Sequence, residues 1–141
     1  MIDETFITNY MTDTFEHVET TVNLGYTFFF YRDDHMHAFA TIASTGNKYE
    51  QISRLDRPGV YRLNIGVSRE MFWSLFGTGK INISDYDFTA LDTIMPHPEY
   101  LSQFFVCVLS PSESTFEQVH PMLADAHEVA VKKYERRNPL Y

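Results

Sequence analysis

Hydrophobic side chains recur at helical spacing at the start of the chain. Those that share one face of a helix are Ile2, Phe6, Ile7, Tyr10, Met11 and Phe15. Asp3 and Glu4 stand where negative charge favours the N-terminal end of a helix dipole. The pattern predicts an amphipathic helix over residues 3 to about 16.

Two aromatic and β-branched segments follow. Residues 26–31 read YTFFFY after the turn signal Asn23-Leu24-Gly25, and residues 39–44 form a second apolar run that ends at Thr45-Gly46-Asn47. Aromatic and β-branched residues favour strands, and the polar stretch between the two runs is typical of a loop. We therefore predict two strands joined as a hairpin.

Residues 60–67 alternate between two kinds of side chain. Tyr61, Leu63 and Ile65 point to one side, whereas Arg62 and Asn64 point to the other. This period of two predicts a strand with one apolar and one mostly polar face.

A short helix is expected next, over residues 69–76, with Ser68 as its N-cap and Gly77 at its end. Residues 77–100 show no regular pattern. The apolar run 103–109 lacks alternation, which indicates a strand covered on both faces.

The C-terminal segment predicts a second long helix. Ser114-x-x-Glu117 is a capping-box pattern, but Pro121 interrupts the helical periodicity. We expect either a kink or a short first turn there, with the main helix from about 120 to 136 and Pro121 near its first position.

These elements predict one α+β domain over residues 1–141. We expect two layers, with an antiparallel sheet of four to six strands and the N- and C-terminal helices packed on one face.

Composition narrows the class of protein. The 141 residues carry 19 acidic and 11 basic side chains, a formal net charge of −8, which disfavours binding to nucleic acid or anionic lipid. An apolar content of 44% exceeds that of disordered chains, and no apolar run is long enough to span a bilayer. The acidic start lacks the character of a secretory signal, so we expect a cytoplasmic protein.

Four arginines, Arg54, Arg57, Arg62 and Arg69, form a basic segment that contains one acid, Asp56. Arg62, on the polar face of its strand beside Asn64, is suited to grip a carboxylate or phosphate. Alternatively, Arg62 pairs with an acid of the chain. The candidates for that acid are Asp85, Asp87 and Asp92.

Histidine and cysteine offer weaker signals. His35 and His37 would lie on one side of an extended segment, with His97 as a possible third metal ligand, but the fixed spacing of a known metal motif is absent. Cys107 lies between valines, which indicates a buried, inert thiol. We expect no metal and no cofactor.

The aromatic strands carry the strongest inference about function. Tyr26, Phe28 and Phe30 project to one face of their strand and Phe29 and Tyr31 to the other. The predicted helices can cover only one face of the sheet, so the second needs a partner or a ligand. A homodimer interface is the leading answer, an aromatic-lined pocket is the second, and stacking of single-stranded nucleic acid is a third that the net charge disfavours.

We therefore expect a non-enzymatic domain that binds a small molecule or another protein, and that forms a homodimer. The ligand would lie between the open sheet face and residues 96–100. In this pocket Arg62 would anchor an anionic group, Asn64 and His97 would supply hydrogen bonds, and Tyr31 and Tyr61 would form walls. The alternative is a small enzyme that uses His97 as acid or base and Arg62 as electrostatic stabiliser, with a metal at His35 and His37.

Four runs of the sequence also carry a family resemblance: RLDRPGVYRLNIGVS (54–68), YDFTALDTIMPHPEY (86–100), FVCVLSPSESTFE (105–117) and ADAH (124–127). They resemble DUF6194, a bacterial family of unknown function, over almost the whole chain. In outline the sequence is also similar to MmcQ/YjbR domains, which implies a compact α+β fold with helices on an antiparallel sheet. Neither resemblance implies a reaction.

Overall fold

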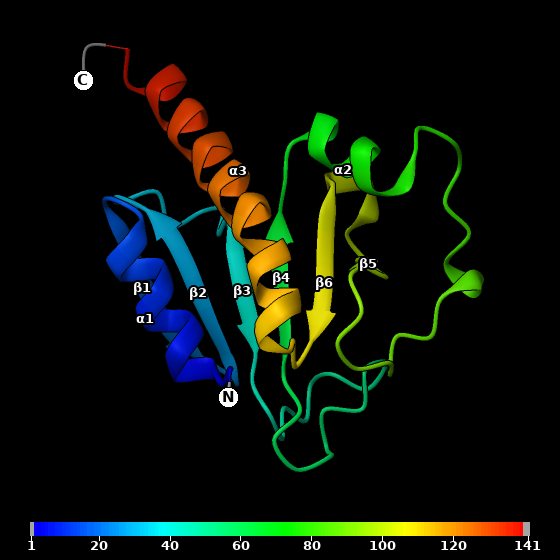
Figure 1. Cartoon of the computed structure of the whole chain (residues 1–141). Helices are drawn as coiled ribbons and strands as arrows, with labels where there is room; N and C mark the ends of the chain where they lie inside the picture. The colour runs from blue at the N-terminus through cyan, green and yellow to red at the C-terminus, as the bar shows by residue number, and fades with distance from the viewer. Residues whose placement is uncertain (1, 140–141) are drawn as a thin grey trace.

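A computed structural model describes residues 2–139 as one six-stranded antiparallel sheet with helices on one face (Figure 1). The strand order is β1-β2-β3-β4-β6-β5. The strands are β1 (Val18–Asn23), β2 (Tyr26–Tyr31), β3 (Ala40–Ala43), β4 (Arg62–Gly66), β5 (Met95–Pro96) and β6 (Phe105–Leu109). The predicted α+β class and antiparallel sheet are confirmed.

The predicted hairpin of β2 and β3 is present, with Tyr26 opposite Ala43. The edge strand β1 has no counterpart among the predicted elements. It pairs with β2 through a two-residue turn in which Leu24 and Gly25 both have positive φ, a backbone that suits the twist of a hairpin. Its residues are largely exposed, so they lack the apolar pattern that marks a buried strand.

Three α-helices complete the fold: α1 (Glu4–Thr14), α2 (Arg69–Phe76) and α3 (Glu113–Arg137). Ser68 caps α2 as predicted, and its hydroxyl accepts a hydrogen bond from the Met71 N–H. Two short 3₁₀ turns, η1 (Ile83–Asp85) and η2 (Leu101–Gln103), lie in the irregular segment and just after it.

The prediction for the start of the last helix is wrong. α3 is one continuous helix that begins at Glu113, with Ser112 as its N-cap, and it contains Pro121 in its interior (Figure 1). Proline removes one intrahelical hydrogen bond. Packing on both sides of the proline, by Phe116 and Val119 before it and Leu123 after it, holds the helix together.

The helices α1 and α3 cover one face of the sheet, called here the helix face. Ile7 and Met11 of α1 and Leu123 of α3 pack on Phe29 and Leu63 of the sheet, all of them completely buried. This is the main hydrophobic core. In residues 2–139 every helix is too short or too polar to cross a membrane.

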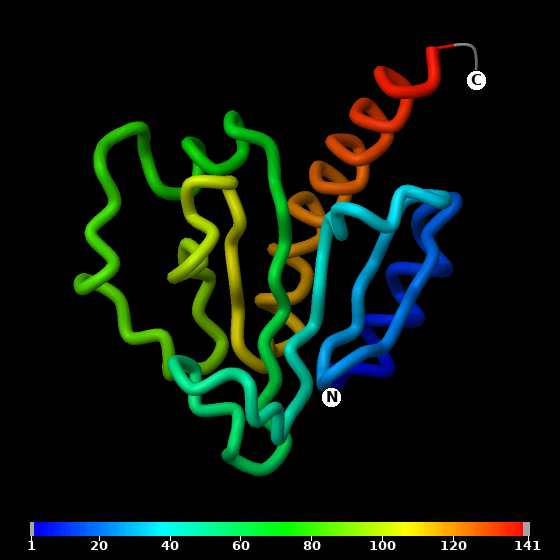
Figure 2. Tube along the Cα trace, turned by 180° about the vertical axis from the view of Figure 1, so that it is seen from behind, coloured from blue at the N-terminus to red at the C-terminus, as the bar shows by residue number. Residues whose placement is uncertain are grey.

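The opposite face, called here the loop face, is partly covered by the chain itself. Segment 44–61 lies at the lower end of the strands and segment 77–100 along the β5 edge (Figure 2), and residues of both contribute to a second, smaller apolar cluster. Its members from these segments are Leu55, Val60, Phe88 and Met95, and they pack on Cys107 and Leu109 of β6. The chain's own segments thus cover part of the face for which the sequence predicted a partner, and the homodimer stays a prediction.

Candidate functional site

A row of residues crosses the loop face from strand to strand. Phe28 lies opposite Thr41, Thr41 opposite Asn64, and Asn64 opposite Cys107. Because side chains alternate along β4, Arg62 lies on this same face, two residues before Asn64. The centre of the loop face is therefore polar.

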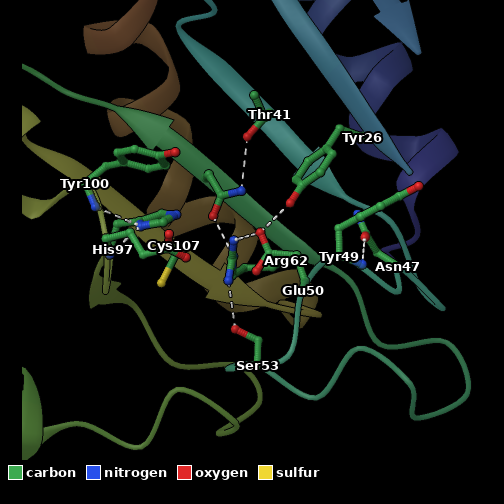
Figure 3. Close-up of polar contacts among 12 residues, drawn as sticks. Tyr26, Thr41, Asn47, Tyr49, Glu50, Ser53, Arg62, His97, Tyr100 and Cys107 are labelled. Carbon is green, nitrogen blue, oxygen red and sulfur yellow. Dashed lines mark hydrogen bonds and ion pairs between the residues drawn. The ribbon is translucent and has the colours of Figure 1, made fainter. Parts of the chain in front are cut away.

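Arg62 is the hub of the polar centre, and its side chain is 1% exposed. Nε donates to Asn64 Oδ1 at 2.8 Å, Nη1 to Ser53 Oγ at 2.9 Å, and Nη2 to Glu50 Oε1 at 2.9 Å (Figure 3). The anion that Arg62 binds is thus the chain's own Glu50.

The expected partners of Arg62 lie elsewhere. Asp87 and Asp92 act as local caps, since Asp87 accepts hydrogen bonds from Thr89 and Asp92 accepts one from the Ser112 N–H. These hydrogen bonds hold the pKa of both carboxyls below the usual range. The interpretation of Arg62 as an ion-paired residue is right, but the acid is one that the sequence pattern did not single out.

Glu50 enters the site from the loop between β3 and β4. Besides Arg62, its Oε1 accepts a hydrogen bond from the Tyr26 hydroxyl at 2.5 Å (Figure 3). Burial and the neighbouring Glu50 carboxylate raise the pKa of Tyr26, so this hydroxyl stays protonated. Asn47 fixes the loop, because its Nδ2 donates to the Gly25 carbonyl and its Oδ1 accepts from the Tyr49 N–H.

His97 reaches the loop face from the other side. Its backbone N–H donates to the Phe105 carbonyl, which extends the pairing of β5 with β6. The ring is buried, and Nδ1 accepts hydrogen bonds from the Glu99 and Tyr100 N–H groups at 3.1 and 3.2 Å. Because Nδ1 is an acceptor, the neutral ring carries its proton on Nε2.

Burial, followed by the positive charge of Arg62, lowers the pKa of His97 to about 3. The ring is therefore neutral near pH 7. Nε2 makes no hydrogen bond to any residue within 2–139, so its N–H is available to the cavity beside it.

A cavity of about 1150 Å³ lies over this polar centre and continues round the end of the sheet toward the C-terminal half of α3. Its lining over the sheet includes Tyr26, Phe28, Thr41, Asn64, Tyr100 and Phe105. Phe28 on β2 and Phe105 on β6 are three strand spacings apart, which is about 14 Å between backbones. The cavity has a polar floor and aromatic walls.

The structure brings three of the five predicted site residues together. Arg62, Asn64 and His97 all line the large cavity. Tyr31 and Tyr61 do not, so their expected place as its walls is wrong. Tyr31 points to the helix face, where it packs edge-on against His127 and Tyr134 and borders a separate pocket of about 60 Å³.

Tyr61 is also on the helix face, and its hydroxyl donates to the Ile2 carbonyl at 2.7 Å. The reason for both errors is the alternation of strands. Tyr61 precedes Arg62 by one position and so faces away from it, whereas Tyr26 and Phe28 share the face of Arg62. Once the pairing of β2 with β3 and of β3 with β4 is known, the alternation of side chains along β2 is enough to place Tyr26 and Phe28 in the walls of the cavity. Glu50 carries no such signal because it lies in a loop.

Of the remaining candidates, His37 lines the large cavity, whereas His35 and Cys107 have structural contacts. His35 Nε2 lies 2.8 Å from Glu19 Oε1, and the ring stacks on Phe30. Within 2–139, no three His, Cys, Asp or Glu side chains are grouped so as to hold a metal ion. Burial raises the pKa of the Cys107 thiol to about 12, so thiolate chemistry is not accessible to it near neutral pH.

A comparison with protein families agrees with the runs identified in the sequence. The model of a family of unknown function, DUF6194, matches residues 2–139. The chain belongs to the DUF6194 family. No curated protein and no solved structure matches this DUF6194 chain. The weaker similarity to MmcQ/YjbR domains gains no support from these comparisons.

Proposed function

We propose that this DUF6194 domain binds a small molecule in the cavity of the loop face and does not catalyse a reaction. The observation that carries the proposal is the hydrogen-bonded cluster of Thr41, Asn64, Arg62 and Glu50, in which Asn64 and Arg62 are buried and which forms the floor of an open cavity with aromatic walls. Cavities with apolar walls and a few fixed polar groups are the usual form of small-molecule sites.

The energetics of the cluster support a role in binding. Removing two charges from water costs several kcal/mol per ion, and apolar residues of similar volume are often as stable as a buried ion pair. Arg62 and Glu50 are nevertheless both buried, and they hold the Asn64 amide in one orientation. An amide held in one orientation at the floor of a cavity favours ligands whose hydrogen-bonding groups match it.

The electrostatics favour binding over the enzymatic alternative. A general acid or base works best with a pKa near the operating pH, whereas the pKa of His97 is about 3 and its Nδ1 already accepts two hydrogen bonds. The charge of Arg62 is compensated by Glu50, which weakens it as a stabiliser of a developing anion.

Two further predictions from the sequence are kept as proposals. A cytoplasmic location accords with the acidic composition. A homodimer would use an apolar surface that the chain's own loops leave bare, and sedimentation at high micromolar concentration distinguishes it from a monomer.

The direct test of binding is a thermal-shift screen of the full chain with neutral, anionic and cationic small molecules. A ligand that binds only the folded state adds about 2.7 kcal/mol at a hundredfold excess over its Kd. We expect at least one compound to raise Tm, and we expect Phe28→Ala or Tyr100→Ala to abolish that rise.

The matched control is Trp73→Ala. Trp73 is 40% exposed on α2 and does not line the cavity, and Tyr100 is 48% exposed, so neither substitution opens the core. If no compound raises Tm, or if the hits respond equally to all three substitutions, the cavity is not a binding site.

A further inference from the structure

The orientation of the polar groups in the cavity points to a class of ligand, an inference that rests on the proposed function. His97 is 2% exposed as a whole residue, and its Nε2–H has no acceptor among the residues described; because no side-chain nitrogen or oxygen in residues 2–139 is both fully buried and unpaired, Nε2 is accessible from the cavity. Such a donor must be satisfied by water or by a ligand, so a ligand without an acceptor at this point loses affinity. In Figure 3 the ring lies between Tyr100 and the Arg62 cluster.

Asn64 offers a second donor. Its Oδ1 accepts from Arg62 and its Nδ2 donates to Thr41 Oγ1 at 3.0 Å. An amide nitrogen carries two N–H groups, so one is left without an acceptor in residues 2–139. The amide cannot flip without losing its bond from the Arg62 guanidinium, which fixes Nδ2 as the donor atom of Asn64, a residue that lines the cavity.

The charges of the floor cancel. Arg62 and Glu50 form an ion pair at 2.9 Å, and His97 is neutral near pH 7. A deeply bound anion or cation would have no uncompensated charge of opposite sign at the floor. The charged side chains that line the cavity elsewhere include both signs, for example Arg69 and Glu70, which are exposed and 3.8 Å apart.

The walls are aromatic. Phe28 and Phe105 are half-buried, and Tyr100 is nearly half exposed beside His97, with ring centroids 4.9 Å apart. Partly exposed rings around a cavity favour a flat ligand, because such a ligand covers apolar area and stacks in offset or edge-to-face geometry.

We propose that the cavity binds a neutral, flat aromatic molecule whose carbonyl oxygen accepts hydrogen bonds from His97 and Asn64, that is, an aromatic carboxamide or lactam.

Three probes of similar size test each part of this proposal: benzamide, benzoate and cyclohexanecarboxamide. Each is titrated into the ¹⁵N-labelled full chain, up to its solubility, while the backbone amides of Phe28, Asn64 and Phe105 and the imidazole nitrogens of His97 are observed by NMR. We expect benzamide alone to shift the cavity resonances, and to move the His97 Nε2 signal.

The substitution His97→Asn isolates the Nε2 donor. An asparagine side-chain oxygen can replace Nδ1 as acceptor for the Glu99 and Tyr100 N–H groups, and Asn before Pro98 favours the same turn. We expect it to weaken benzamide binding about three- to tenfold, the effect of one hydrogen bond. His17→Asn is the control, because His17 is exposed and its φ of 61° suits asparagine.

Each other result of the titrations refutes one named part of the proposal. Binding of benzoate at the cavity as tight as that of benzamide refutes the neutral ligand, and equal binding of cyclohexanecarboxamide refutes the aromatic one. Binding of benzamide without a shift of His97 Nε2 refutes the assigned donor, a readout of the unsubstituted protein that holds even if His97→Asn fails to fold. In these cases the cavity is still a binding site. If none of the probes shifts a cavity resonance, the ligand class is wrong, and the wider thermal-shift screen decides whether the cavity binds anything.

Discussion

Gly66 of β4 lies opposite Phe105 of β6, and the Phe105 ring fills the space above the glycine. A Cβ at position 66 would lie 2.8 Å from Phe105 Cζ and 2.9 Å from Cε1, closer than side chains tolerate. The missing side chain of Gly66 therefore sets the position of the aromatic wall that Phe105 contributes to the cavity.

The first prediction follows from this contact. Gly66→Ala forces the Phe105 ring outward or strains the pair of strands, and overpacking of this kind costs about 1–3 kcal/mol of unfolding free energy. Urea unfolding measures the loss. Gly79→Ala is the matched control, because no atom lies within 4 Å of a Cβ placed there, and it should leave stability almost unchanged. Equal effects of the two substitutions would refute the proposed role of Gly66.

The second prediction concerns the ion pair at the floor. Glu50→Ala leaves Arg62 buried without its counter-charge, and breaking a buried pair in this way costs about 3–5 kcal/mol. Glu50→Gln keeps an acceptor for Arg62 and Tyr26 and should cost less. The double variant Glu50→Gln/Arg62→Met should recover part of the stability, which a double-mutant cycle in urea measures.

A surface pair supplies the control for Glu50. Arg54 and Asp56 lie 3.4 Å apart with both side chains largely exposed, and exposed pairs contribute little. Asp56→Asn should leave the urea midpoint unchanged. If Glu50→Gln is equally silent, the cluster does not hold the loop against the sheet.

Much of the candidate site can be predicted from the sequence because strands alternate. The period of two over residues 60–67 is enough to identify Arg62 and Asn64 as neighbours on one face of a strand. The same rule could have excluded Tyr61, which faces the opposite way. Tyr31 is excluded only with the register of β2 against β3 and of β3 against β4, which is a tertiary feature.

Glu50 and β1 are two features that the local sequence pattern does not predict. Glu50 pairs with Arg62 because the conformation of the loop over residues 44–61 brings it to the guanidinium, and loop conformation leaves no periodic trace in the sequence. β1 is an exposed edge strand, so its stability comes from hydrogen bonding to β2 and not from an apolar face.

The third prediction uses Pro121, which the sequence indicated as a helix boundary and which lies inside α3. The ring is exposed, and an interior proline disfavours a helix by about 3 kcal/mol relative to alanine. Pro121→Ala should restore the hydrogen bond of residue 121 to the Glu117 carbonyl and raise Tm. Ala124→Gly changes an exposed α3 position one turn further on and should lower Tm. Glycine in a helix interior costs about 1 kcal/mol of unfolding free energy relative to alanine. A lower Tm for Pro121→Ala would mean that the helix depends on a proline-specific bend.

The fourth prediction is a pH dependence of stability caused by His97. The pKa of this ring is about 3 in the folded protein and near its ordinary value of 6.5 in the unfolded chain. Between these values the unfolded chain binds a proton that the folded protein does not. His97 therefore does not reduce the free energy of unfolding above about pH 6.5. As the pH falls from 6.5 toward 3, protonation of His97 in the unfolded chain lowers the free energy of unfolding by at most about 1.4 kcal/mol per pH unit.

Urea unfolding between about pH 5 and 6.5 isolates this effect, because the carboxyls with lowered pKa values, such as Asp87 and Asp92, whose ordinary pKa is 3.8, add their own loss of stability mainly below about pH 5. In that window His97→Asn should show a flatter pH profile than the unsubstituted protein, whereas His17→Asn should keep the steeper one. A profile for His97→Asn that parallels the unsubstituted protein would show that the pKa of His97 is the same in the folded and unfolded chain, so that burial beside Arg62 does not hold the ring neutral below pH 6.5.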